Sequence, residues 1–337
     1  MTNKLVALVT GASSGIGEAT AIKLAAAGFN RSTSISRTAT ETRITFNINT
    51  FKTAIIAIAL AATASLMPVG AFAADKGKVL VVMSSAQALE LRDGKQYQTG
   101  YFLNELAIPL RMLVDAGYTP VFANPKGDTP QMDASSNNKN YFGGDDAKRT
   151  DALSYVAKFD SLKKPKTLAS VAAEGASGYA AVFIPGGHAP MQDLIKEQSL
   201  GTILKNFHAA AKPTAIICHG PIALLSTLPE AAKFQSAIIA GDAATAKNLS
   251  QGWTYAGYKV SVFSTSEEKQ IEGKAQLGGQ VLFYPDAALA AAGATIQNGA
   301  NWQSNVVVDR ELITGQQPLS AEAFGKALIA KLAAQAK

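Results

Sequence analysis

The stretch TAIICHGPIALL, residues 214–225, holds the only cysteine of this 337-residue chain. Four residues suited to a buried strand lead into Cys218. His219, Gly220 and Pro221 then turn the chain into an apolar run that we expect to be a helix. A cysteine at such a corner resembles a nucleophile elbow, in which the side chain is exposed above a sheet. The stretch therefore predicts an α/β fold with a site at the carboxyl ends of parallel strands.

The thiol of Cys218 has two interpretations. A lone cysteine is most often a small buried hydrophobe. At this corner, however, the positive end of the following helix would lower the pKa of the thiol. The thiolate is the form that attacks carbonyl carbon. The order of strand, cysteine, histidine, glycine and proline favours the functional interpretation.

A regular alternation of strands and helices surrounds this corner from Lys78 onward. The polar stretch 124–150 is predicted to be a long loop and a candidate rim of the site. Residues 74–337 are therefore predicted to form one doubly wound α/β domain with a mainly parallel sheet flanked by helices. The expected strands are 78–83, 119–123, 180–185, 214–218, 258–263 and 304–315, the last as a hairpin about Asp309–Arg310, and the expected helices are 105–117, 199–211 and 321–334.

The first 37 residues differ from that domain. They read as a short strand, a turn containing Gly11, Gly15 and Gly17, and a helical run. This opening resembles the start of short-chain dehydrogenases, and the likeness ends near residue 37. That family's catalytic tyrosine and lysine have no convincing counterpart downstream. Since a lone βα unit cannot build a cofactor cleft, we interpret residues 1–37 as a non-functional fragment that binds no dinucleotide.

Residues 38–73 read as a linker followed by a segment typical of a signal peptide. Lys52 precedes an apolar run over residues 54–67, and Ala71-Phe72-Ala73 supplies small residues at a cleavage position. Cleavage after Ala73 would place the protein in the periplasm or outside the cell, with no stable membrane insertion afterwards. A buried helix and an uncleaved membrane anchor are the alternatives.

The charge of the chain argues against a nucleic-acid partner. The net charge is +6, but residues 1–73 carry six basic and two acidic residues. The remaining residues carry 25 basic and 23 acidic residues, without the basic excess of a nucleic-acid-binding domain. One cysteine excludes an intramolecular disulfide, and three histidines leave little material for a metal centre, so we expect no metal.

Four motifs in order carry a resemblance to the ThiJ/PfpI family of the class I glutamine-amidotransferase-like superfamily. The resemblance covers nearly all of residues 78–334 and is strongest to the glyoxalase III and heat-shock-type branch. It implies a single flavodoxin-like domain. The motifs are TGYFLNELAIPL (99–110), FIPGGHAPMQDL (183–194), AIICHGP (215–221) and VVVDRELITGQQP (306–318).

The resemblance also implies roles for individual residues. Cys218 matches the nucleophile, and His219 matches the histidine that forms a dyad with an acidic residue. Glu105 matches a carboxylate that contacts the thiol and shuttles protons. Gly186 and Gly187 match a pair whose N–H groups stabilise an oxyanion. His188 is expected to line the pocket.

Helix geometry supports the role of Glu105, whereas the acidic partner of His219 is chosen from the family pattern alone. Glu105 lies off the apolar face of its helix, formed by Leu106, Leu110 and Leu113, so it is free to point toward the strand ends. Half-buried beside a thiolate, its carboxyl group would have a raised pKa, although a solvated or capping glutamate is the alternative. Glu267 and Glu268 both follow the strand ending at Phe263, and the family pattern favours Glu268 as the partner of His219.

The expected function is a cofactor-independent glyoxalase III-like lyase that acts on methylglyoxal or related small aldehydes. It would need no metal, nucleotide or glutathione. A holding chaperone or a redox-sensing protein whose thiol is oxidised is the first alternative. A cysteine-dependent amidase or peptidase is the second, although glutamine amidotransferases place their histidine far downstream of the cysteine. A homodimer is an open alternative to a monomer.

Overall fold

The computed structural model describes residues 6–10, 30–36, 39–45, 76–273 and 276–335. The chain divides into two compact units, residues 1–71 and residues 72–337. The second unit begins two residues before the predicted domain start at residue 74. The predicted glycine-rich turn at residues 11–17 and the signal-like segment at 51–73 lie outside the described residues.

The first unit contains a three-stranded antiparallel sheet. Its strands are β1 (Val6–Thr10), β2 (Asn30–Ser36) and β3 (Ala39–Thr45), in the order β1-β3-β2. The strand β3 lies at the start of residues 38–73, for which the sequence predicts a linker and a signal-like segment, and its threonines and isoleucine favour an extended chain. A dinucleotide-binding unit pairs its strands in parallel, whereas β3 runs antiparallel to both neighbours.

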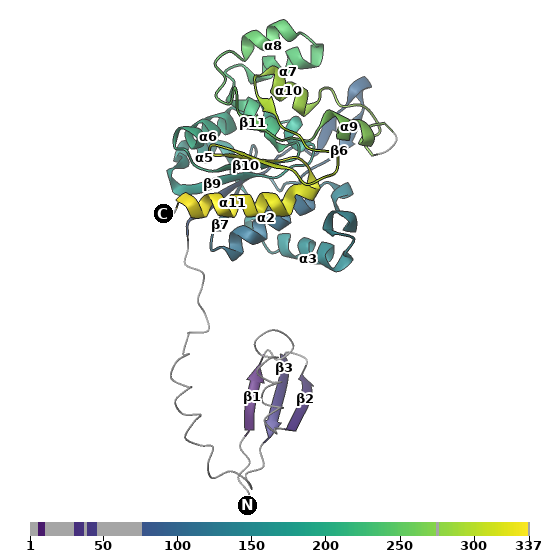
Figure 1. The fold of residues 1–337 in the computed structure, drawn as a ribbon, viewed down its shortest axis with the longest axis vertical. Coiled ribbons are helices and arrows are strands. Elements are labelled where there is room, and N and C mark those ends of the chain that lie inside the picture. Colours follow the sequence, from purple (N-terminus) through teal and green to yellow (C-terminus); the bar gives the residue numbers. More distant parts are fainter. Residues whose placement is uncertain (1–5, 11–29, 37–38, 46–75, 274–275, 336–337) are drawn as a thin grey trace, which may run out of the picture. The chain divides into compact units, whose positions relative to one another are not determined.

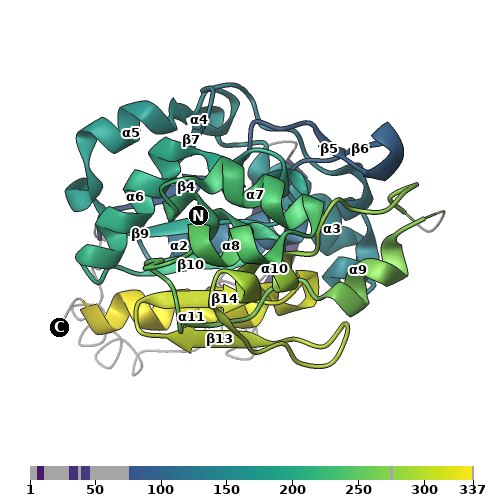
Figure 2. The same ribbon diagram turned by 90° about the horizontal axis from the view of Figure 1, so that it is seen from above.

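The second unit is built on a seven-stranded sheet with the order β13-β14-β10-β9-β4-β7-β8 (Figure 1). Every pairing in it is parallel except that of the edge strand β13 with β14. Figure 2 shows β13 at one edge and β7 toward the other. The predicted mainly parallel α/β fold is confirmed. The strands are β4 (Lys78–Val82), β7 (Thr119–Asn124), β8 (Lys166–Thr167), β9 (Tyr179–Ile184), β10 (Thr214–Ile217), β13 (Val306–Asp309) and β14 (Leu312–Gly315).

Helices cover both faces of this sheet because its strands are apolar on both sides. Along β4, Val79 and Val81 pack into one core, and Leu80 and Val82 into the other. One face holds α2 (Leu103–Asp115), α3 (Asp146–Val156), α4 (Asp160–Lys163) and α11 (Ala321–Gln335), with α2 against α11. The other holds α5 (Leu168–Glu174), α6 (Gln198–Ala209), α7 (Ala231–Ala240), α8 (Ala243–Leu249) and α10 (Pro285–Ala291). Among the described residues, none of these helices is long and apolar enough to cross a membrane.

Two sequence predictions need correction. Residues 258–263 were expected to add a strand to the sheet, but only β11 (Lys259–Val260) forms, paired with β12 (Thr295–Ile296) outside it. Polar side chains take the next amides: Thr314 Oγ1 accepts from the Ser261 N–H and Asn298 Oδ1 from the Val262 N–H.

The stretch 124–150, predicted to be a loop, contains short 3₁₀ turns at Ala134–Ser136 and Lys139–Phe142 and the first turn of α3. The Asp145 side chain caps that helix by accepting from the amides of Ala147 and Lys148.

Candidate active site

Cys218 lies directly after β10, at the corner that the sequence predicts. Its φ of +65° falls in the left-handed region, which costs a non-glycine residue about 1–3 kcal/mol. Two backbone hydrogen bonds hold it there: its N–H donates to Gly315 (2.8 Å), and its carbonyl accepts from Phe263 (2.9 Å). The expected helix after it is a 3₁₀ helix, Gly220–Thr227, rather than an α-helix. The corner is thus a nucleophile elbow in geometry.

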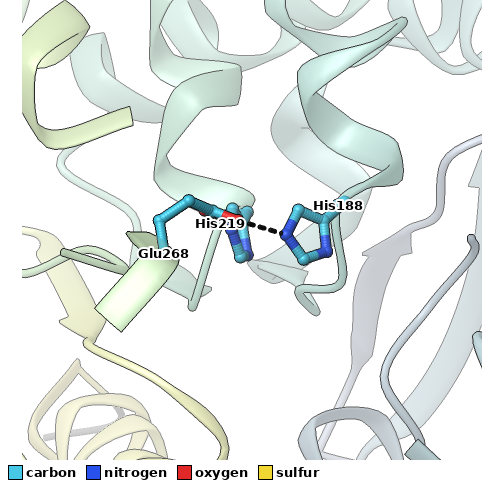
Figure 3. Close-up of side chains that lie close together, drawn as sticks. All are labelled: His188, His219 and Glu268. Atoms are coloured by element: carbon cyan, nitrogen blue, oxygen red, sulfur yellow. Dashed lines mark hydrogen bonds and ion pairs between the residues drawn. The ribbon is translucent and has the colours of Figure 1, made fainter. Parts of the chain in front are cut away.

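A chain of contacts joins the sulfur of Cys218 to two histidines and one carboxylate. Cys218 Sγ lies 3.2 Å from His219 Nδ1, and His219 Nε2 lies 2.6 Å from Glu268 Oε2. The second oxygen of Glu268 lies 2.8 Å from His188 Nε2. Figure 3 shows the His188 imidazole directed at this carboxylate, with the His219 ring beside it. The sequence predicted His188 as a pocket residue but gave no sign that it shares Glu268 with His219.

Glu267, which the sequence left open as the partner of His219, has a structural role. It lies at the start of α9 (Thr265–Ile271) and forms a capping box with Ser264. Its other contacts are the Trp302 N–H and Gln316 Nε2. Consecutive residues of a helix point in different directions, so Glu267 faces its cap while Glu268 faces His219.

Burial and mutual contact shift the pKa values of Glu268, His188 and His219 in different directions. Burial would raise the pKa of Glu268, but the two imidazoles hold it below its usual range, so it is ionised. Burial would lower the pKa of His188, but Glu268 raises it above its ordinary value. The pKa of His219 is lowered by burial and by His188. The two opposite shifts favour a proton on His188 over one on His219, and neutral His219 can donate from Nε2 to Glu268 and accept at Nδ1 from the thiol.

Glu105 lies in the first turn of α2 and is completely buried, not half-buried as expected. A Cβ at Gly186 would overlap both Glu105 Oε2 and Cys218 Cβ, so only glycine fits between them. Burial raises the pKa of Glu105 to about 8, although the Cys218 thiol and the Gly186 amide limit the rise. Glu105 is thus an acid–base group poised near neutrality.

The prediction that the Cys218 thiol has a lowered pKa is wrong. Burial raises its pKa well above the ordinary value, and the charge of Glu105 raises it further. The amides of Gly187 and His219 approach the sulfur and only partly offset this. At rest the site therefore holds a thiol, and nucleophilic attack requires a base beside it.

The predicted oxyanion pair is also arranged differently. The Gly187 amide approaches the sulfur of Cys218, but the Gly186 amide approaches the Glu105 carboxyl. The second amide near the sulfur belongs to His219. In a nucleophile elbow, the amide of the residue after the nucleophile contributes to the oxyanion hole. The Cys-His motif could therefore have identified the His219 amide as a donor.

The pocket in front of Cys218 has a volume of about 20 Å³, room for roughly one water molecule. Phe263 stacks on the His219 ring, with centroids 4.4 Å apart. Tyr141 comes from the stretch that the sequence predicted as a rim, whereas nothing in the sequence singled out Trp302 or Gln276. The lining residues are Phe102, Tyr141, Gly187, His188, Cys218, His219, Phe263, Ile271, Gln276, Trp302 and Pro318.

The same cluster includes groups that could ligate a metal ion. His188, His219 and Glu268 offer ligand atoms within 4.8 Å of one another. Both Nε2 atoms already face the carboxylate, so a cation there would displace two N–H protons. The sequence expectation of no metal remains a prediction.

Comparison with known proteins relates this site to a family. The profile described as ThiJ/PfpI family-like matches residues 97–266. The protein named protein/nucleic acid deglycase HchA from Staphylococcus aureus (strain MSSA476) is 28% identical over 266 residues, which cover 76% of this chain and 80% of that protein. Its namesake from Escherichia coli O157:H7 is 28% identical over 254 residues, covering 74% and 79%.

Two solved structures share the fold. Glyoxalase III from Candida albicans superposes with a TM-score of 0.57 at 22% identity, covering 77% of this chain and 98% of that chain. The Francisella tularensis rapid encystment protein REP24 gives a TM-score of 0.55 at 24% identity, covering 76% and 99%.

Proposed function

The chain belongs to the ThiJ/PfpI family, and from that premise we propose that it is a cofactor-independent, glyoxalase III-like enzyme. Its substrate is methylglyoxal, or the same carbonyl unit attached to a larger molecule. The observation that carries the proposal is the contact chain from Cys218 through His219 to Glu268, with the buried Glu105 carboxyl beside the same cysteine. The deglycase and glyoxalase III names of its relatives support the same chemistry.

The residues divide the reaction among them. The sulfur of Cys218 adds to the aldehyde carbon of methylglyoxal, while the thiol proton passes to His219 Nδ1, 3.2 Å away. The amides of Gly187 and His219 stabilise the oxyanion of the resulting hemithioacetal. Glu105 then removes the hydrogen from the first carbon as a proton and returns it to the neighbouring carbon, while the proton held by His219 passes to the oxygen of that neighbouring carbon, which leaves a lactoyl thioester. Water cleaves the thioester, releasing lactate and restoring the thiol.

Purified full-length protein is expected to convert methylglyoxal to lactate without glutathione and in the presence of a chelator. Methylglyoxal loss and lactate formation should match one to one. The holding chaperone or redox sensor of the same fold remains the second candidate, because it needs the same buried thiol but no turnover. Suppression of client aggregation without any methylglyoxal loss would favour that candidate and contradict the proposal.

The relatives' printed name also bears on the partner prediction. It includes nucleic acid as well as protein, which stands against the expectation of no nucleic-acid partner. We propose that a carbonyl adduct is the unit recognised at Cys218, and that the molecule carrying it is selected elsewhere on the surface.

We further propose that residues 51–73 act as an export signal. The support is the sequence pattern of Lys52, the apolar run and Ala71-Phe72-Ala73. Protein isolated from its host is then expected to begin at or near Ala74 and to lie in the periplasm or outside the cell, which intact-mass measurement of each fraction checks. A full-length cytosolic species as the sole product would contradict this.

A further inference from the structure

Trp302 adopts a backbone conformation that a bulky residue rarely takes. Its φ of +57° falls in the left-handed region, where the Cβ of a large side chain is crowded by the following carbonyl. Glycine or asparagine is the usual residue at such a position. Strain of this kind persists only where neighbouring contacts hold the residue, and it is found most often at functional sites. The strain at Trp302 therefore points to a role for its side chain.

Two hydrogen bonds to α9 hold Trp302 in this conformation. Its backbone N–H donates to Glu267 Oε1 (2.8 Å), and its indole Nε1–H donates to Gln270 Oε1 (2.7 Å). Glu267 directly precedes Glu268, the carboxylate that contacts His219. Because the indole would have to break the second bond to turn away, its position is fixed relative to the helix that carries Glu268.

The ring of Trp302 lies at the mouth of the pocket in front of Cys218. Its centroid lies 5.7 Å from that of Phe263, whose own ring stacks on His219. Most of the described residues that line the pocket are buried. The four that are only partly buried, and so form its mouth, are Tyr141, Ile271, Gln276 and Trp302. Trp302 has the largest side chain of the four.

The volume of this pocket limits which part of a substrate can enter it. At about 20 Å³ it holds one water-sized group, such as an aldehyde carbonyl. When the aldehyde carbon of a 2-oxoaldehyde reaches Cys218, the group on its ketone carbon must therefore lie among the residues of the mouth. The size of that group is then limited by the side chain there that is held most firmly.

We propose that Trp302 sets the size of the substrate accepted at Cys218, admitting methylglyoxal and excluding 2-oxoaldehydes with a branched or aromatic group on the ketone carbon. The indole occupies the space that such a group needs, and its bond to Gln270 keeps it there. This inference rests on the proposed function and adds to it the kind of substituent that the site admits. Trp302 is a specificity residue and takes no part in proton transfer.

The test compares kcat/KM for methylglyoxal with kcat/KM for tert-butylglyoxal, which has the same reacting atoms and three additional methyl groups. In the full-length protein, Trp302→Gly is expected to raise kcat/KM for tert-butylglyoxal by roughly tenfold or more relative to methylglyoxal. Glycine adopts a positive φ without steric cost, so the backbone can keep its path. Trp302→Asn, which also tolerates this φ, takes its place should the glycine variant not fold.

Trp302→Phe separates the size of the ring from its hydrogen bond. Phenylalanine keeps an aromatic ring at the mouth but cannot donate to Gln270, so the rise should be smaller than in Trp302→Gly. Asp93→Gly is the matched control, because Asp93 has a φ of +61°, is exposed and does not line the pocket. It should leave the ratio of the two kcat/KM values unchanged.

The outcomes separate the inference from the proposed function. If Trp302 only stabilises its loop, Trp302→Gly will lower both kcat/KM values together and leave their ratio unchanged, which overturns the inference alone. Equal kcat/KM values for the two substrates in the wild type, or an equal rise in the glycine and phenylalanine variants, also overturn it. Absence of methylglyoxal turnover by the wild type overturns the proposed function itself.

Discussion

Cys218→Ser is expected to abolish methylglyoxal turnover while the protein remains folded. A serine hydroxyl has a far higher pKa than a thiol and forms no reactive anion under the same bases. The substitution preserves the size of the side chain and both backbone hydrogen bonds that hold residue 218 at a φ of +65°. Lactate formation measures the loss, and thermal denaturation verifies the fold.

Wild-type turnover by this variant would contradict the site drawn around Cys218. If the protein is a holding chaperone instead, Cys218→Ser should still suppress the aggregation of client proteins. Measuring both quantities on the same preparation distinguishes the two functions.

Glu105→Gln is expected to slow turnover by roughly 10²–10⁴-fold, the usual range for the loss of a positioned acid–base group. The amide keeps the shape of the buried side chain but cannot move a proton between two carbons. Proton removal from the hemithioacetal needs the carboxylate form, so wild-type kcat should rise with pH through about 8. The variant should lack that rise. A pH profile of kcat for both proteins is the measurement, and a rise retained in the variant would assign it to another group.

The same substitution has an expected effect on stability whose sign follows from the raised pKa. The unfolded chain releases the Glu105 proton near pH 4.5, whereas the folded protein keeps it up to about pH 8. This stabilisation is fully present below about 4.5 and is lost as the pH rises to about 8. Each unit of pKa difference corresponds to about 1.4 kcal/mol. Urea unfolding at both ends of this window should show a decline in the wild type that is weaker in Glu105→Gln.

The losses in the two single variants are not expected to add. Without the carbon–sulfur bond formed by Cys218 there is no hemithioacetal for Glu105 to deprotonate, so Cys218→Ser with Glu105→Gln should be no slower than Cys218→Ser alone. Multiplied losses in the double variant would show that Glu105 acts independently of Cys218.

The sheet and the elbow could be predicted because both depend on local patterns. Apolar strands such as 78–83 and 214–218 indicate a sheet covered on both faces, and a cysteine followed by His-Gly-Pro indicates a sharp turn. Residues 258–263 also read as a strand, yet the side chains of Thr314 and Asn298 accept from the amides of Ser261 and Val262 in place of a neighbouring strand. Whether a side chain or a neighbouring strand binds these amides depends on residues far away in the sequence, so it cannot be predicted from residues 258–263 alone.

The electrostatics of the site could not be predicted for a related reason. The sequence indicates which residue follows a strand, but not that Cys218 is only 2% exposed or that the Glu105 carboxyl lies beside its side chain. These two facts reverse the expected direction of the thiol pKa. Likewise, the contact of His188 with Glu268 joins residues 80 positions apart.

The most direct test of the central claim uses the single cysteine of the chain. Cys218 is the only residue that iodoacetamide can alkylate as a thiol, so mass spectrometry gives the modified fraction without ambiguity. Residual methylglyoxal turnover should fall in proportion to that fraction and reach zero at complete labelling, and added methylglyoxal should slow the labelling. Fully alkylated protein that still converts methylglyoxal to lactate would contradict the account.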